Sequence, residues 1–257
     1  MKKNMAFTLA ETLVVIGIIG IVSALTLPNL NGSTGDKEKV AKVQKLQTEL
    51  NDAIGRAQVV YGPIHEWYLN DNDDTGVTMR SDFSTKVGKF LKISKRCEAN
   101  SEGCFTNATP KNFRGGNTEN FWNLSKSSTG PRLILADGTS VYLHMWSRGC
   151  SGAKAPDGNQ TVCGWIEVDI DGPNKGPHQL GKDLFIFDFA ESYGVYPYGS
   201  FQVDYVPSDI YAKCFSLGTG CSAWINDFGN LDYLKADASG KCSNGKVLDG
   251  KTVTSCK

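Results

Sequence analysis

A single acidic residue near the start of the chain constrains its fold more than any other feature. Residues 7–30 form an apolar run that follows Lys2 and Lys3, and Glu11 is the one charged residue within it. An ionised glutamate in a membrane-length segment costs about 2.5–3.5 kcal/mol on insertion scales, so a plain membrane anchor would be favoured by its loss. We therefore expect Glu11 to have a cationic partner.

Cleavage of the Ala6–Phe7 bond would create such a cation, the amine of a new N-terminal Phe7. This cut would precede the apolar run, whereas a secretory signal is cut after its apolar region and then lost. The run would therefore stay in the mature chain. A signal anchor that happens to carry a glutamate is the alternative interpretation.

The basic leader, Ala6, the string Phe7-Thr8-Leu9-Ala10-Glu11, the apolar helix and Pro28 together resemble the prepilin-type N-terminus of type IV pilins and type II secretion pseudopilins. The usual residue before the cut in that family is glycine, where this chain has Ala6. The resemblance implies that a prepilin peptidase cuts after Ala6 and methylates the amine of Phe7. It further implies that Glu11 pairs with the Phe7 amine of a neighbouring subunit during assembly.

The sequence as a whole also predicts a domain order and a location. Residues 1–6 would be the leader, 7–30 a transmembrane and assembly helix, 31–62 an amphipathic helix, and 63–257 an extracytoplasmic globular domain. Because basic residues favour the cytoplasmic side, the chain would sit in the inner membrane by a single pass and then join a periplasmic or cell-surface filament. Pro28 is predicted to kink the helix, and residues 31–35 to form a break or a flexible stretch.

The rest of the chain predicts an α+β fold in which the long N-terminal helix, a membrane half plus an amphipathic half, packs on a mostly antiparallel sheet. The amphipathic half carries one apolar stripe at three- and four-residue spacing: Val40, Val43, Leu46, Leu50, Ile54, Ala57 and Tyr61. Ser81 or Asp82 could cap a further short helix.

Strand patterns follow this helix. Asp137-Gly138, between two apolar stretches, predicts a hairpin with a type I′ turn. Residues 165–170 alternate strictly, residues 183–189 predict another strand, and the aromatic-rich residues 222–234 are expected to contain one more.

Eight cysteines predict a disulfide framework in an oxidising compartment, including a C-terminal disulfide loop. None lies in a C-x-x-C motif, which argues against a zinc ribbon or a thioredoxin-like centre. Many connectivities are open, and sequential pairing is the choice that closes the shortest loops: Cys97 with Cys104, Cys150 with Cys163, Cys214 with Cys221, and Cys242 with Cys256.

The segment around residues 168–187 raises the question of a metal. Asp169 and Asp171 leave a strand just before a Gly-Pro turn, and Asp183 returns after the loop, so the three carboxylates could converge on a hard cation such as Ca²⁺. The spacing is poor for an EF-hand, since His178 stands where a bidentate glutamate would be needed. A solvated strand face followed by a turn is the alternative, and we predict no metal or other cofactor.

We expect a structural role rather than an enzyme. The three histidines, His65, His144 and His178, lie in no H-E-x-x-H motif, and the chain has no G-x-S-x-G elbow or P-loop. The formal net charge is zero, which gives no reason to expect nucleic acid as a partner.

The predicted function is a pilin-like subunit of a type IV pilus or a type II secretion pseudopilus, two roles that share one N-terminus. The predicted partners are a prepilin peptidase, other pilin or pseudopilin subunits and the inner membrane. A membrane-anchored binding or hydrolytic domain that does not polymerise is the alternative.

Overall fold

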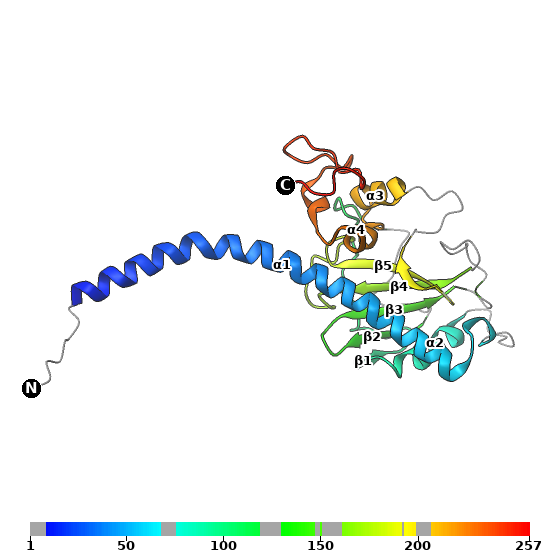
Figure 1. Ribbon diagram of the computed structural model, residues 1–257. Coiled ribbons are helices and arrows are strands. Elements are labelled where there is room, and N and C mark those ends of the chain that lie inside the picture. Colours follow the sequence, from blue (N-terminus) through cyan, green and yellow to red (C-terminus); the bar gives the residue numbers. More distant parts are fainter. Residues whose placement is uncertain are drawn as a thin grey trace, which may run out of the picture. The chain divides into compact units, whose positions relative to one another are not determined.

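A computed structural model describes residues 9–67, 76–118, 130–146, 150, 161–191, 193–198 and 207–257, with the backbone alone at residues 9–12, 19–34 and 207–209. The chain forms two units, Met1–Lys39 and Val40–Lys257. The leader and Phe7 lie outside the described residues. The elements, shown in Figure 1, are α1 (Leu9–Tyr61), η1 (Ile64–Glu66), α2 (Val77–Gly88), β1 (Ile93–Cys97), β2 (Arg132–Leu135), β3 (Ser140–Met145), β4 (Val162–Asp169), β5 (Leu184–Ala190), β6 (Gly194–Pro197), α3 (Pro207–Ser216), α4 (Cys221–Phe228) and η2 (Asp232–Lys235).

α1 differs from the predicted N-terminal helix in two ways. Its backbone is helical through Pro28 and through residues 31–35, where the sequence predicted a break. The helix is also not the long apolar element that was expected. In the N-terminal part of α1, the described apolar side chains are those from Leu13 to Ile18.

Among the described residues, no helix has the length and apolar character that crossing a membrane requires. This finding overturns the predicted membrane half of the helix and the predicted single-pass location in the inner membrane.

The C-terminal part of α1 packs on the sheet as its apolar stripe predicts. The stripe from Val40 to Ala57 is buried, and Tyr61 packs against the same core. Polar side chains add hydrogen bonds between the helix and the sheet region: Lys42 Nζ donates to the Ile170 carbonyl at 2.5 Å, and Gln47 Nε2 donates to the Val195 carbonyl at 3.0 Å.

The six strands form one antiparallel sheet in sequence order, β1 to β6. α2 lies on the same side of the sheet as this part of α1. α4 contacts β5 and β6, and α3 packs on α4 (Figure 1). Side chains of a strand alternate between the two faces, so every second residue belongs to the helix-covered face. Val141, Leu143, Ile166, Val168 and Phe187 lie on that face and form the main core.

The opposite face of the sheet is unusual because it buries polar side chains. Arg132, Tyr142, His144, Glu167 and Asp169 alternate with the core residues of β2, β3 and β4, and all are buried. The charged positions in the strand 165–170 were expected on a solvated face, and this expectation is wrong for Glu167 and Asp169. The alternation of apolar and polar residues along a strand identifies the two faces of the sheet, but it does not show whether other segments cover each face.

Three local predictions need correction. The hairpin exists, but Gly138 is its only residue with positive φ, so the turn is not type I′, which needs positive φ at Asp137 as well. The short helix α2 begins at Val77, before the predicted caps, with Gly76 as its N-cap. Residues 222–234 contain α4 and η2 instead of a strand, because Trp224 and Ile225 meet the core on one helical face.

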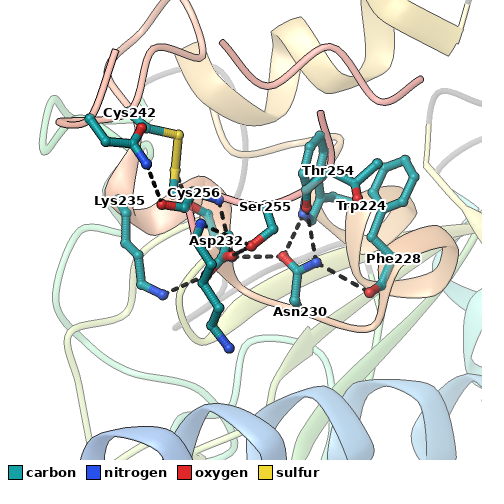
Figure 2. A network of polar contacts seen from close by, with 11 residues as sticks. Trp224, Phe228, Asn230, Asp232, Lys235, Cys242, Thr254, Ser255 and Cys256 are labelled. Atoms are coloured by element: carbon teal, nitrogen blue, oxygen red, sulfur yellow. Dashed lines mark hydrogen bonds and ion pairs between the residues drawn. A yellow bond between two sulfur atoms is a disulfide. The ribbon is translucent and has the colours of Figure 1, made fainter. Parts of the chain in front are cut away.

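The four disulfides join the sequential pairs Cys97–Cys104, Cys150–Cys163, Cys214–Cys221 and Cys242–Cys256. The last pair helps to hold the C-terminal tail, which is also fixed by the polar network in Figure 2. The Asp232 carboxylate accepts hydrogen bonds from Lys235 Nζ at 2.5 Å, from the Ser255 hydroxyl and from the Cys256 amide at 3.2 Å. Asn230 Nδ2 donates to the Thr254 carbonyl at 3.1 Å.

The Asp232 network makes a testable contribution to stability. Burial raises the pKa of Asp232, but the hydrogen bonds from Lys235 and Ser255 outweigh it and hold the pKa below its ordinary value. We expect Asp232→Asn to lower the free energy of unfolding at neutral pH by about 1.5–3 kcal/mol, the range for hydrogen bonds to charged groups. Denaturant unfolding at several pH values measures this difference.

The pH dependence has a definite sign. A depressed folded-state pKa contributes stability that is complete above the unfolded pKa of about 3.9 and is lost as the pH falls through the folded value. The difference between wild type and Asp232→Asn should therefore shrink on acidification below about pH 4. Asp52→Asn is the control, because Asp52 forms an exposed ion pair with Arg56 on α1, worth about 0.3–0.5 kcal/mol. A difference that persists unchanged into acid would contradict the prediction.

Candidate functional site

The residues predicted for processing and assembly lie at or beyond the edge of the described chain. Ala6 and Phe7 are outside it, and Glu11 and Pro28 are described as helical backbone within α1. Their predicted roles therefore stay predictions.

Next to these positions, α1 exposes a row of large apolar side chains. Leu13, Val14, Val15, Ile16 and Ile18 are each between 51% and 63% exposed. Large apolar side chains are common singly on protein surfaces, but a contiguous group marks an interaction site. These residues occupy five of six consecutive helical positions, so they surround the helix instead of forming one stripe.

A second candidate site lies where β4 and β5 meet their connecting loop. Asp169 ends β4, Asp183 directly precedes β5, and His178 lies in the loop between them. One ligand atom from each of the three lies within 4.8 Å of the other two. His178 Nδ1 is 2.8 Å from Asp169 Oδ2, and both aspartates are fully buried.

Backbone amides hold both carboxylates in place. Asp169 Oδ1 accepts hydrogen bonds from the amides of Asp171 and Gly172, each at 3.1 Å. The oxygens of Asp183 accept from the amides of His178 and Gln179, each at 2.6 Å. The loop thus supplies its own N–H groups to the two aspartates, and this fixes their orientation.

Burial raises the pKa of Asp169 to about 7, opposed by the hydrogen bond with His178 and reinforced by the charge of Asp183. The pKa is this high because the ionised carboxylate loses its hydration and faces a second carboxylate. The ionised form of Asp169 is therefore disfavoured in this buried position, and a proton or a cation at the carboxylate would relieve the cost.

The structure alters the metal hypothesis drawn from the sequence. Asp169 and Asp183 meet as predicted, but the third member of the cluster is His178 and not Asp171. The alternative of a solvated strand face is wrong for the two aspartates, which are buried. In the sequence, His178 stands out only as a departure from the EF-hand pattern. Its place five residues after Pro173 and five before Asp183 was a signal for the cluster, but only the β4–β5 pairing makes it meaningful.

A third group, on the same face of the sheet, joins Arg132, Tyr142, His144, Trp165 and Glu167. The Arg132 guanidinium lies 4.6 Å from the centroid of the Tyr142 ring, and the Tyr142 hydroxyl is 2.9 Å from His144 Nδ1. His144 stacks on Trp165 with ring centroids 3.7 Å apart, and Trp165 Nε1 donates to Glu167 Oε1 at 2.7 Å. Sequence reasoning missed Arg132, which carries no motif and is 1% exposed.

In this third group, burial shifts the pKa values of His144 and Glu167 toward their neutral forms. Burial, with the charges of Arg80 and Arg132, lowers the pKa of His144 to about 3. Burial also raises the pKa of Glu167 well above its ordinary value. A general base works best with a pKa near the working pH, so His144 is poorly suited to proton transfer at pH 7. We interpret His144 and Glu167 as a polar part of the core.

The remaining histidine, His65, is exposed and lies 2.6 Å from Glu191 through Nδ1. The three histidines thus each have a partner and occupy three separate environments.

No protein-family model matches the chain, and neither a curated protein nor a solved structure is significantly similar to it. The resemblance to pilins therefore depends on the N-terminal residues alone.

Proposed function

We propose that this chain is a pilin-like structural subunit of a type IV pilus or a type II secretion pseudopilus, processed between Ala6 and Phe7 and assembled through α1. The observation that carries the proposal is the row of exposed apolar side chains from Leu13 to Ile18. It follows directly after Glu11, in the part of the sequence that resembles a prepilin.

The distribution of these side chains favours assembly with several neighbours. Successive residues of an α-helix are about 100° apart, so a run at consecutive positions presents apolar groups in all directions. A helix that is apolar all round is stable when it is surrounded, whereas a single stripe is enough for one partner. Burial of apolar area contributes roughly 25 cal/mol per Å², so helices of neighbouring subunits that surround this segment would stabilise a filament.

The second unit, Val40–Lys257, has its own core and its own cross-links, as a subunit that folds before assembly needs. Val40–Lys257 has a core built from α1, α2 and the sheet, and four disulfides within the unit cross-link it. Its folding therefore does not require contact with another chain. The proposed partners are a prepilin-type peptidase and other pilin or pseudopilin subunits.

Processing at the N-terminus tests the proposal. After co-expression with a prepilin-type peptidase, we expect the chain to lose residues 1–6 and to begin with an N-methylated Phe7. Intact mass and N-terminal sequencing measure both changes.

Two variants of one residue sharpen this test. Ala6→Gly supplies the residue usual in the family and should be processed at least as fast as wild type, whereas Ala6→Leu places a bulky side chain before the cut and should block it. Retention of residues 1–6 in wild type, beside a peptidase that cleaves a known substrate, would contradict the proposed function.

A further inference from the structure

The cluster at the end of β4 differs from the calcium site considered from the sequence. Asp169, His178 and Asp183 bring two carboxylates and an imidazole to one buried place, with one ligand atom of each within 4.8 Å of the others. Asp169 and Asp183 are fully buried, and the His178 side chain is 12% exposed. The three residues come from the two ends of one loop and from the loop itself, so a ligand here would close the loop.

Charge is the first reason to expect a ligand. The carboxylates of Asp169 and Asp183 lie together in one buried place, and the imidazole of His178 is hydrogen-bonded to one of them. Ionised groups are buried in proteins when they are paired or bound to a metal, because their hydration is lost otherwise. A divalent cation favours the ionised form of both carboxylates, and it binds His178 as a neutral imidazole.

An unpartnered hydroxyl beside the cluster is the second, independent observation. Ser140 in β3 is directly opposite Asp169 in β4, and its side chain is fully buried. Within the described part of the chain, Ser140 Oγ has no hydrogen-bond partner. Directly opposed residues of an antiparallel pair project from the same face of the sheet, so this hydroxyl lies on the Asp169 side. A buried hydroxyl without a partner is unfavourable, and a ligand bound at Asp169 would give it one.

The donor atoms indicate which metal fits. Ca²⁺ prefers six to eight oxygen ligands, whereas imidazole nitrogen with carboxylate oxygen suits Zn²⁺ and related ions. No cysteine thiolate is available as an alternative metal ligand, because all eight cysteines are in disulfides. The backbone amides that bind both carboxylates act as the outer contacts that orient metal ligands in known sites.

We propose that Asp169, His178 and Asp183, with Ser140 beside them, form a binding site for a divalent transition metal such as Zn²⁺. The metal replaces the hydrogen bond between His178 Nδ1 and Asp169 Oδ2 and ties the loop to the ends of β4 and β5. This site lies in the unit Val40–Lys257 and does not depend on the proposed filament role.

The test uses the purified full chain with its disulfides intact and freed of metal by a chelator. Zn²⁺ is titrated by calorimetry, and Co²⁺ is added separately as a spectroscopic probe of ligand number. We expect one Zn²⁺ per chain, a rise in melting temperature on binding, and Co²⁺ bands typical of a site with few nitrogen and oxygen ligands. Absence of Zn²⁺ binding by the folded wild type, or binding of Ca²⁺ in its place, would overturn the proposal.

Variants then locate the bound ion. His178→Ala should weaken Zn²⁺ binding at least about 100-fold, since even changes to outer contacts of a metal site cost roughly 10- to 100-fold. His65→Ala is the matched control, because His65 lies beside Glu191 and Glu66 at the surface, at 2.6 and 3.8 Å, and its loss should leave binding unchanged.

Asp169→Asn keeps the shape of the carboxylate and should also weaken binding strongly, which gives a second measurement if His178→Ala does not fold. Equal affinity in wild type and folded His178→Ala, or weaker binding in His65→Ala alone, would overturn the assignment. Unchanged affinity in Ser140→Ala would remove Ser140 from the site.

Discussion

Glu11→Leu is expected to abolish filament assembly while leaving the chain folded, oxidised and processed. If Glu11 pairs with the Phe7 amine of a neighbouring subunit, as the resemblance to prepilins implies, its loss leaves that cation unpaired among apolar helices. Removing one partner of a buried ion pair costs about 3–5 kcal/mol, and a filament repeats this cost at every contact. The yield of sheared surface filaments, relative to the total amount of the protein, measures the effect.

A second acidic residue of the same helix provides the control. Glu38 lies in α1 and is exposed, so Glu38→Leu changes charge and apolarity in the same way away from the predicted pair. Its filament yield should match that of wild type. Equal yields from Glu11→Leu and wild type, where partner subunits are expressed, would contradict the assembly role. Loss of assembly in both variants would point to a general effect of added apolar surface.

Gly164→Ala is expected to be among the most damaging single substitutions in the sheet. A Cβ atom at Gly164 would lie 2.0 Å from the carbonyl oxygen of His144 and 2.8 Å from the ring of Phe189. Overpacking typically costs about 1–3 kcal/mol, and this contact involves a backbone atom that cannot rotate away. We expect the free energy of unfolding to fall by at least about 3 kcal/mol, measured by denaturant unfolding.

The same substitution at Gly55 should have the opposite sign. Gly55 lies in α1 with nothing within 4 Å of the position where a Cβ would be placed. Glycine inside a helix is less favourable than alanine by about 0.5–1 kcal/mol, so Gly55→Ala should stabilise the protein by that amount. Unchanged stability in Gly164→Ala would contradict the close backbone packing at Gly164. A loss of stability in Gly55→Ala would contradict the open space at Gly55 on α1.

Much of the fold could be predicted because its signals are local. The apolar stripe from Val40 to Ala57 lies on one face of any α-helix, and alternation in residues 165–170 separates two faces of any strand. The Asp137-Gly138 hairpin and the disulfide pairs join residues that are close in sequence, so short loops already bring them together.

The structure differs from the sequence prediction where one local sequence pattern is compatible with more than one conformation or environment. The aromatic-rich residues 222–234 suit a strand or a helix equally, and contact with the core favoured α4. A charged residue that alternates with core residues along a strand is normally predicted to face solvent. Glu167 and Asp169 are instead buried, because other parts of the chain cover that face of the sheet.

The sequence by itself determined the periodic elements, the hairpin and the short disulfide loops, and it supplied the prepilin-like residues from Ala6 to Glu11. Only the tertiary structure decided that Asp169 and Asp183 share a buried place with His178, and that Ser140 lies opposite Asp169 without a partner. The reason is physical: periodicity fixes the direction of a side chain within its own element, whereas its neighbours depend on pairing between strands that are distant in sequence.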